Sequence, residues 1–239
     1  MSPSHPDSLR RPRRSAVVAP AASKVAVALL ASAMLGVSAC RGPARTSLRA
    51  EDYPGVLLPA TDLPVEAVWQ QRVTARWQAP GQAPQERGFD AAVQRSGDRL
   101  TVVGLSPMGS VGFTIEHGPE GVEFTNRVPD QMAIPPRFIL LDVQRAFFPW
   151  FDGPADPEET RSRERDGEHI TERWQDGRLV ERTFARVDGA PEGQIRVRYR
   201  WGDAGWAAPV EAVLHNGWFG YELTIETIRQ TLIPAGGGA

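Results

Sequence analysis

The sequence predicts a mainly β fold in which a large curved antiparallel sheet, or open half-barrel, wraps over one central helix that plugs it. From about Leu57 onward apolar and polar residues alternate, as is typical of strands with one buried face and one face in water. Asp-Gly and Asn-Gly pairs, which favour tight hairpin turns, divide this stretch into about ten strands. A single apolar helical stretch interrupts the alternation, and we expect the sheet to cover it.

The first 39 residues are predicted to be a cleavable lipoprotein signal peptide, so they are excluded from the fold. A basic region ending at Lys24 precedes an apolar run over 25–37, which is shorter than the roughly 20 residues that span a bilayer. The small residues before Cys40, the only cysteine, resemble the lipobox of bacterial lipoproteins. The alternative is a buried helix that happens to end in cysteine. Cys40 is therefore the predicted lipid attachment site, and membrane lipid is a predicted partner.

After the signal peptide the sequence predicts a flexible tether over 40–56, one domain over 57–232 and a disordered tail over 233–239. The formal charge of the whole chain is −2, and the part that follows the arginine-rich leader is more acidic. An acidic domain of this kind is a poor partner for nucleic acid. In similar lipoproteins of Gram-negative bacteria, an aspartate directly after the cysteine favours the inner membrane. Arg41 stands at that position, so we expect a lipid-anchored protein on the periplasmic face of the outer membrane.

The clearest strands show strict alternation, with apolar residues at the odd positions of 111–116, 194–201 and 221–226. The predicted helix over 137–148 begins after two prolines and ends before Pro149, positions that tolerate a residue without an N–H. Apolar residues occupy most of its circumference, so it is expected to lie buried inside the curved sheet.

A dense run of mixed charges lies between the helix and the second set of strands, over 156–166. Charge of this kind keeps exposed strand edges from pairing with other chains, so an exposed edge strand or loop is the favoured interpretation. A docking site for another protein is the alternative.

No pattern of catalytic or metal-binding residues is recognisable. There is no Gly-x-Ser-x-Gly nucleophile motif, and His117, His169 and His215 are scattered without zinc-ligand spacing. We therefore expect neither catalysis nor a metal or other cofactor. The seven tryptophans suit carbohydrate stacking, but their spread along the chain favours ordinary packing in the core and at its rim.

The block LTVVGLSPMGS over 100–110, followed by FTIE at 113–116 and by the two prolines ahead of the helix, resembles a known family. It is a family of bacterial lipoproteins of unknown function that are often encoded with aryl-polyene biosynthesis genes. That family is in turn similar to the LolA/LolB group of periplasmic lipoprotein carriers and receptors, whose fold is an open antiparallel barrel with helices across its mouth. The resemblance extends roughly over 65–228.

This resemblance implies that the concave face of the sheet forms an apolar cavity for acyl chains or another long hydrophobic ligand. It also implies that Met108, at the tip of a hairpin, contacts the membrane, although an ordinary turn with a methionine is the alternative. The charged run over 156–166 departs from the receptor pattern. The candidate cavity residues are Val102, Phe113, Ile115, Phe124, Phe138, Leu141, Phe148, Tyr199 and Leu223.

The function expected from the sequence is that of a non-catalytic outer-membrane lipoprotein that binds or transfers a hydrophobic ligand. The candidate ligands are an acyl chain, the lipid of a lipoprotein and an aryl-polyene lipid, and a periplasmic carrier protein is a candidate partner. The first alternative is an assembly lipoprotein with a filled core that acts through protein–protein contacts. The second alternative is an envelope hydrolase.

Overall fold

The computed structural model describes residues 49–78, 81–106, 108–127, 134–202 and 207–234. The predicted signal peptide, the lipid attachment site Cys40 and most of the predicted tail lie outside these residues. Among them, no helix is both long and apolar enough to cross a membrane.

The described residues form one open antiparallel sheet of eleven strands in the order β5-β4-β3-β2-β1-β11-β10-β9-β8-β7-β6. Two meanders are joined where β1 pairs with β11, and every pair of neighbours is antiparallel. This open sheet with one helix among the described residues confirms the predicted fold class. The strands are Ala67–Trp77 (β1), Gln85–Ser96 (β2), Arg99–Leu105 (β3), Val111–Gly118 (β4), Gly121–Asn126 (β5), Thr160–Arg165 (β6), Glu168–Gln175 (β7), Arg178–Arg186 (β8), Gln194–Arg200 (β9), Glu211–Asn216 (β10) and Tyr221–Leu232 (β11).

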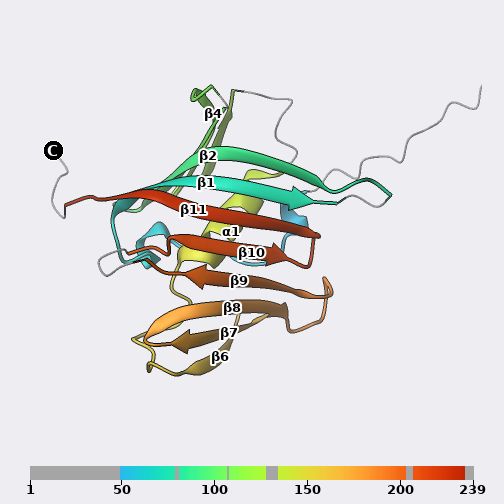
Figure 1. The fold of residues 1–239 in the computed structure, drawn as a ribbon, viewed down its shortest axis with the longest axis vertical. Coiled ribbons are helices and arrows are strands. Elements are labelled where there is room, and N and C mark those ends of the chain that lie inside the picture. Colours follow the sequence, from blue (N-terminus) through green and yellow to red (C-terminus); the bar gives the residue numbers. More distant parts are fainter. Residues whose placement is uncertain (1–48, 79–80, 107, 128–133, 203–206, 235–239) are drawn as a thin grey trace, which may run out of the picture. The chain divides into compact units, whose positions relative to one another are not determined.

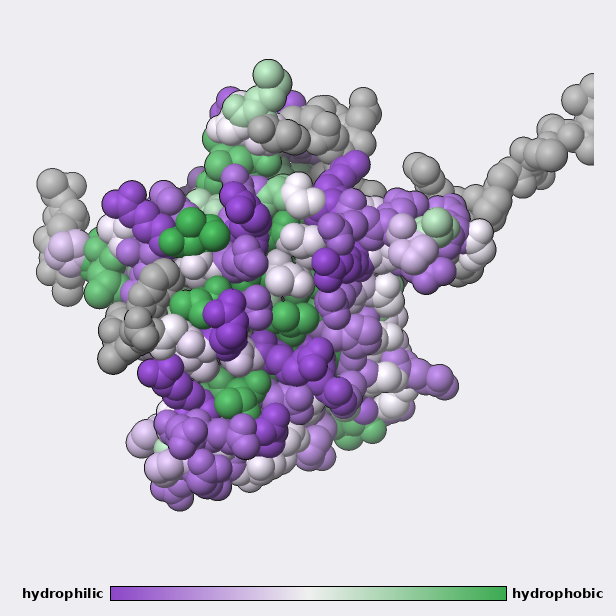
Figure 2. Space-filling view, viewed as in Figure 1, coloured by the Kyte–Doolittle hydropathy of each residue, from purple (hydrophilic) through white to green (hydrophobic). Residues whose placement is uncertain are grey.

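The alternation of the sequence is visible in the burial of the strands. In β9, Ile195 and Val197 are fully buried, while Arg196 between them and Arg198 after them are exposed. Asp166 and Asp176 have positive φ angles of 53° and 50° in the turns β6–β7 and β7–β8, as the Asp-Gly hairpin pattern requires. Figure 2 shows the outward face of the sheet as mostly hydrophilic, with apolar residues only in scattered groups. One face of the sheet therefore meets water and the other meets the core.

Helix α1 (Pro136–Phe147) lies against the inner face of the sheet, behind β1, β11 and β10 in Figure 1. Pro136 occupies the first helical turn, where its missing N–H removes no hydrogen bond, and the chain leaves the helix at Phe148. β4 runs across the direction of β9 in Figure 1, so the sheet turns strongly around the helix. Burial extends all around the helix and includes the polar residues Asp142, Gln144 and Arg145.

The segment before β1 contains two short 3-10 helices: η1 (Ala50–Asp52) contacts α1, and η2 (Ala60–Asp62) contacts β3. Tyr53, which falls inside the predicted tether, is completely buried, so packing begins before Leu57. Helix side chains bind the backbone of this segment: the amide of Gln144 accepts from Leu58 N and donates to Leu58 O, both at 2.8 Å. Buried backbone groups need such partners, and these bonds explain why a stretch with little periodicity is held in place.

Strand β6 forms one edge of the sheet and contains most of the mixed-charge run. This position confirms the predicted edge strand for 160–165, while 156–159 and 166 lie in the adjoining loops. The arginines of β6 nevertheless do not all face water: the guanidinium carbon of Arg161 lies 4.6 Å from the ring centre of Phe151, and that of Arg165 lies 5.6 Å from the ring of Trp150. The edge strand thus contributes to the inner side of the sheet as well.

Candidate ligand-binding pocket

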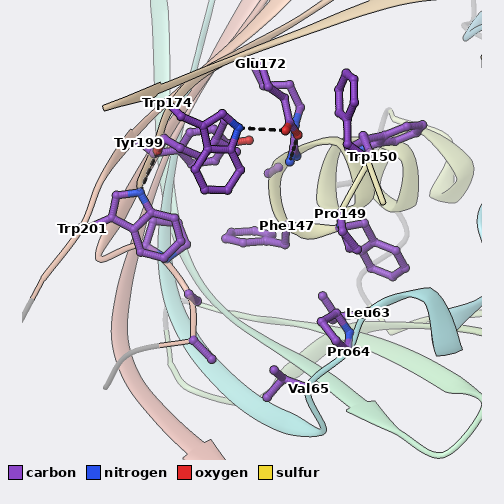
Figure 3. Close-up of a pocket in the computed structure, with 18 of the residues that line it drawn as sticks. Leu63, Pro64, Val65, Phe147, Pro149, Trp150, Glu172, Trp174, Tyr199 and Trp201 are labelled. Atoms are coloured by element: carbon purple, nitrogen blue, oxygen red, sulfur yellow. Dashed lines mark hydrogen bonds and ion pairs between the residues drawn. The ribbon is translucent and has the colours of Figure 1, made fainter. Parts of the chain in front are cut away.

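A pocket of about 300 Å³ lies where the C-terminal end of α1 meets the inner face of β1, β7, β8 and β9. Segments 63–65, 149–151 and 207–209 complete its wall. In Figure 3, Phe147 projects from the helix toward Trp201, with Trp174 and Tyr199 beside it and Leu63, Pro64 and Val65 opposite. The aromatic residues that line the pocket are Trp69, Phe147, Phe148, Trp150, Phe151, Trp174, Tyr199 and Trp201.

Strand alternation, a β-bulge and a proline explain where these aromatic rings lie. Tyr199 follows Ile195 and Val197 at strand spacing and therefore shares their inward face. A bulge between Arg173 and Trp174 shifts the register of β7 against β8 just where the strand reaches the pocket. On the helix side, Pro149 prevents α1 from continuing. The chain then turns, and its next residues complete the wall.

The four tryptophans that line the pocket donate their indole N–H groups to other groups of the protein. Trp201 Nε1 donates to Leu179 O at 2.7 Å, Trp150 Nε1 donates to Gln144 O at 3.2 Å, and Trp174 Nε1 donates to Glu172 Oε2 at 3.1 Å. Trp69 Nε1 likewise donates to Gln230 Oε1 at 3.3 Å. Because the N–H groups are occupied, the tryptophans present mainly carbon to the pocket.

One wall of the pocket is charged. Glu172 is 1% exposed and lies between two arginines, with Oε2 3.0 Å from Arg161 Nη2 and Oε1 2.6 Å from Arg182 Nη2. Arg182 also donates through Nη1 to the backbone oxygen of Arg145 at 2.8 Å, which ties this group to the end of the helix. Burial raises the pKa of the neighbouring Tyr199 to about 12, against the opposing effect of Arg182, so its phenol stays neutral.

A second polar cluster lies deeper, around the middle of α1, where side chains fill the space. Asp142 accepts hydrogen bonds from Tyr53 at 2.5 Å and from Tyr221 at 2.6 Å, and Asn216 donates to both phenol oxygens at 2.9 Å. Burial raises the pKa of Asp142 to about 6, although the two phenols oppose the shift. Four side chains, from the residue after η1 and from α1, β10 and β11, thus hydrogen-bond to one another.

Arg145, about one helical turn after Asp142 on α1, is completely buried and forms an ion pair with Glu168 at 2.7 Å. Its Nη2 also donates to Pro54 O at 2.8 Å. Its Nε and Nη1 have no hydrogen-bond partner among the described residues, and the guanidinium is enclosed by aromatic rings instead. The ring centres of Tyr53, Trp218 and Phe184 lie 4.6, 5.2 and 5.4 Å from its central carbon.

The structure distributes the nine predicted cavity residues over different environments. Phe148 and Tyr199 line the pocket. Phe113 and Leu223 are partly buried against the core, and Phe124 on the edge strand β5 is 40% exposed. Fully packed core positions are occupied by Val102, Ile115, Phe138 and Leu141.

Sequence reasoning missed most of the pocket. The nine candidates do not include Phe147, Trp150, Trp174 or Trp201. The spread of the tryptophans along the chain favours general packing, and Phe147 is part of the apolar surface of the predicted helix. The available signal was the density of aromatic residues over 147–151. The same reasoning missed the buried polar residues of α1, which stand out only as polar positions inside an otherwise apolar helix.

Met108 lies in the turn between β3 and β4 and is 94% exposed. A backbone hydrogen bond of 2.7 Å from Ser106 N to Ser110 O closes this turn. The structure thus places Met108 at a hairpin tip, while its contact with a membrane stays a prediction. The role of Cys40 also stays a prediction, since it lies outside the described residues.

The three histidines of the domain lie apart. His117 shares a hydrogen bond of 3.0 Å with Leu58 O, and His169 and His215 are exposed on β7 and β10. Within the described ranges, no group of three or more His, Cys, Asp or Glu residues is arranged to hold a metal ion.

The fold and the site define a class of protein with an open antiparallel sheet wrapped over one helix and an aromatic pocket at the end of that helix. Residues 68–229 match the family described as "Protein of unknown function (DUF3261)", and the chain belongs to this family. No curated protein matches the chain in sequence.

Several solved structures are similar to this chain. A LolA superfamily protein from Nitrosomonas europaea is 15% identical with a TM-score of 0.38, and the match covers 74% of this chain and 94% of that one. A domain described as an outer membrane lipoprotein-sorting protein from Vibrio parahaemolyticus is 9% identical with a TM-score of 0.41, covering 73% and 87%. The lipoprotein LppX from Mycobacterium tuberculosis is 11% identical with a TM-score of 0.31, covering 72% and 87%.

Proposed function

We propose that this protein is a lipid-anchored envelope protein that binds an apolar chain or ring in the aromatic pocket and holds or transfers it without catalysis. The observation that carries the proposal is the pocket of about 300 Å³ whose tryptophans have their N–H groups bonded to the protein. Ligand pockets are lined mainly by hydrophobic and aromatic side chains with a few polar groups, which is the composition of this one.

The volume restricts the ligand. Small-molecule pockets range from about 300 to about 1,000 Å³, so this one is at the lower end and suits a single chain rather than a two-chain lipid. Each buried methylene contributes about 0.8 kcal/mol, so a chain needs only part of its length inside to be retained. An acyl chain, one chain of a lipoprotein lipid and the chain of an aryl-polyene lipid all meet this requirement.

The cellular setting of the proposal comes from the sequence. Acyl chains on Cys40 would anchor the protein, and Arg41 favours the periplasmic face of the outer membrane. The exposed Met108 would rest on the membrane surface and bring the protein close to its ligand. A periplasmic carrier protein is the partner that such a binding protein would receive its ligand from or hand it to.

The experiment is photocrosslinking of the full-length chain in phosphatidylcholine nanodiscs with a neutral, diazirine-bearing dodecanol. Mass spectrometry is expected to place crosslinks in the peptides that contain 147–151, Trp174 and 199–201. Ala207→Trp adds a large ring at an exposed position of the pocket wall and is expected to reduce this labelling at least fivefold. The matched control is Ala83→Trp, at an exposed position in the turn between β1 and β2, which leaves the labelling unchanged.

Labelling that is spread over the outward face of the sheet, or that is the same in Ala207→Trp and in the control, would overturn the proposal. That result would favour the assembly lipoprotein, for which the filled space around Asp142 and Arg145 is the supporting observation. Such a protein would then be recovered in a stoichiometric complex with another envelope protein.

A further inference from the structure

The charged wall of the pocket has an unequal number of opposite charges. Glu172 is the partner of both Arg161 and Arg182, so two guanidinium groups share one carboxylate. These three residues all line the pocket, and all are largely buried. The side chain of Glu172 is 1% exposed, that of Arg161 is 15% exposed and that of Arg182 is 5% exposed. The wall therefore carries a surplus positive charge beside an apolar space.

The carboxylate of Glu172 has no capacity left for a ligand. Its Oε1 accepts from Arg182 Nε at 2.8 Å and lies 2.6 Å from Nη2, while its Oε2 accepts from Arg161 Nε at 3.1 Å and Nη2 at 3.0 Å and from Trp174 Nε1. A carboxylate offers about four lone-pair sites. A ligand group that donates hydrogen bonds, or that carries a positive charge, finds no free acceptor there.

The guanidinium groups, in contrast, still have N–H groups to offer. Among the described residues, Arg161 makes hydrogen bonds to Glu172 and through Nη1 to Gly153 O, the last one long at 3.4 Å. Arg182 makes its hydrogen bonds to Glu172 and to Arg145 O. A guanidinium has five N–H donors, so each arginine keeps donors that these bonds do not use. The polar groups of the pocket are therefore suited to an acceptor, and the surplus charge favours a negative one.

We infer that the ligand is a single-chain amphiphile with an anionic head, a carboxylate or a phosphate, whose head binds Arg161 and Arg182 while its chain lies among the aromatic rings. This inference rests on the proposed function and specifies the chemical class of its ligand. The carboxylate would come from a fatty acid, and the phosphate from an alkyl phosphate or a lysophospholipid.

The test is competition against the neutral photoprobe on the full-length chain in phosphatidylcholine nanodiscs. Four unlabelled competitors share a twelve-carbon chain: dodecanoate, dodecyl phosphate, dodecanol and dodecyltrimethylammonium. Because hydrogen bonds to charged groups are worth more than neutral ones, at least one anion is expected to compete about tenfold or more better than dodecanol. The cation is expected to be weakest, and the order of the two anions distinguishes the sources.

Competitors that differ in head group also differ in how strongly they partition into the bilayer. Two arginine variants control for this difference, because the same competitor is compared between the unchanged protein and each variant in the same nanodiscs. Arg161→Gln leaves one guanidinium for Glu172, and the advantage of the anion over dodecanol, both measured in this variant, is expected to fall to within about twofold. Arg163→Gln is the matched control: Arg163 is on the same strand two residues away, is paired with Asp152 at 3.6 Å and does not line the pocket. This control is expected to keep the full preference.

The two proposals fail in different ways. If the photoprobe labels the pocket but dodecanol and the cation compete as well as the anions, the anionic head is overturned and the apolar pocket stands. An anion preference that survives in Arg161→Gln would also overturn the assignment of the head to this wall. If the photoprobe does not label the pocket at all, the proposed function itself fails. Should Arg161→Gln not fold, the head-group series on the unchanged protein still decides the question.

A chain-length series gives an independent measure. Each methylene that enters the pocket is expected to improve competition about fourfold, until the chain fills the space. A plateau for the longer carboxylates is expected in the unchanged protein. In Ala207→Trp the plateau is expected at a shorter chain, whereas a series that rises without a plateau in both proteins indicates partitioning into the bilayer and overturns the inference.

Discussion

Two arginine–glutamate clusters lie on the inner side of the same sheet and differ in their surroundings. Arg145 and Glu168 form a one-to-one pair that is 1% and 2% exposed, and aromatic rings enclose the arginine on several sides. Glu172 instead has two arginines, and its cluster borders a pocket. The same residue types are thus part of a filled core in one place and of a candidate ligand site in the other.

Burial alone therefore does not identify a binding residue. A buried ion pair is a weak source of stability, but the loss of one partner leaves an uncompensated charge. A cluster with a redundant partner tolerates the loss of one arginine and has positive charge to spare. We therefore expect the two clusters to respond differently to equivalent substitutions.

The largest effect is expected for Arg145→Met, which leaves Glu168 buried without its cation and removes the bond to Pro54 O. The free energy of unfolding is expected to fall by about 3 to 5 kcal/mol, measured by urea unfolding of the full-length chain with tryptophan fluorescence. The double variant Arg145→Met/Glu168→Leu should regain part of this loss because no charge is left unpaired. A loss below about 1 kcal/mol in the single variant would show that the pair is not critical.

The next effect is a pH dependence from Asp142, whose pKa burial raises from 3.8 to about 6. The folded protein then binds this proton more tightly than the unfolded chain, so the contribution of Asp142 to stability rises as the pH falls from about 6 to about 4. The gain is on the order of 3 kcal/mol for a shift of this size. The charged and polar groups facing Asp142 are Tyr53, Tyr221 and Arg145, and none of them titrates in this window.

The check is urea unfolding of the unchanged protein and of Asp142→Asn at several pH values between 4 and 7. Burial also raises the pKa of Glu168, against the effect of Arg145, so the difference between the two proteins is the informative quantity. That difference should change across the window, since only the unchanged protein has the carboxyl. Parallel profiles would contradict the expected role of Asp142.

A smaller effect is expected for Tyr53→Phe, which removes the hydroxyl that donates to Asp142 and accepts from Asn216. The expected loss is about 2 kcal/mol, since two buried polar groups lose a partner. Tyr199→Phe is the matched control: its hydroxyl is 3.4 Å from Arg145 O, a long contact, and its removal should cost about 0.5 kcal/mol or less. Equal losses in thermal or urea unfolding would mean that the two hydroxyls are equivalent.

Among the substitutions in the ion pairs and the Asp142 cluster, the smallest effect on stability is expected for Arg161→Gln, because Glu172 keeps Arg182 and Trp174 as partners. The loss should be about 1 kcal/mol, well below that of Arg145→Met, although both substitutions remove an arginine from a glutamate. Urea unfolding of both variants under the same conditions gives the ratio. Similar losses would remove the contrast between the filled cluster and the pocket cluster.

Several features of the fold were predictable from short-range patterns. Alternation of apolar and polar residues predicted the strands, as in β9, and the prolines placed the helix to within one residue of Pro136–Phe147. The mixed charges over 156–166 predicted the edge strand β6. These patterns are reliable because each depends only on a residue and its near neighbours: on their exposure to water, or on the backbone N–H that proline lacks.

The pocket was not predictable in the same way. Its aromatic residues come from distant parts of the chain: Trp174 lies on β7, Trp201 follows β9, and Phe147 lies on α1. Only the order of the strands in the sheet brings these residues together. Of the nine residues proposed from the resemblance, two line the pocket, and four are packed in the core, as Phe138 and Leu141 are. An inward direction follows from alternation, whereas empty space depends on the volumes of all the side chains around it.

Periodicity and proline act within a few residues, so the order of the amino acids was enough to indicate the strands, the ends of the helix and the faces that avoid water. The tertiary structure alone decided that Arg145 is enclosed by rings while Arg161 and Arg182 share Glu172 beside a pocket. The physical reason is that ion pairing and packing depend on contacts between residues far apart in the chain, such as Arg145 and Pro54, and no local pattern records them.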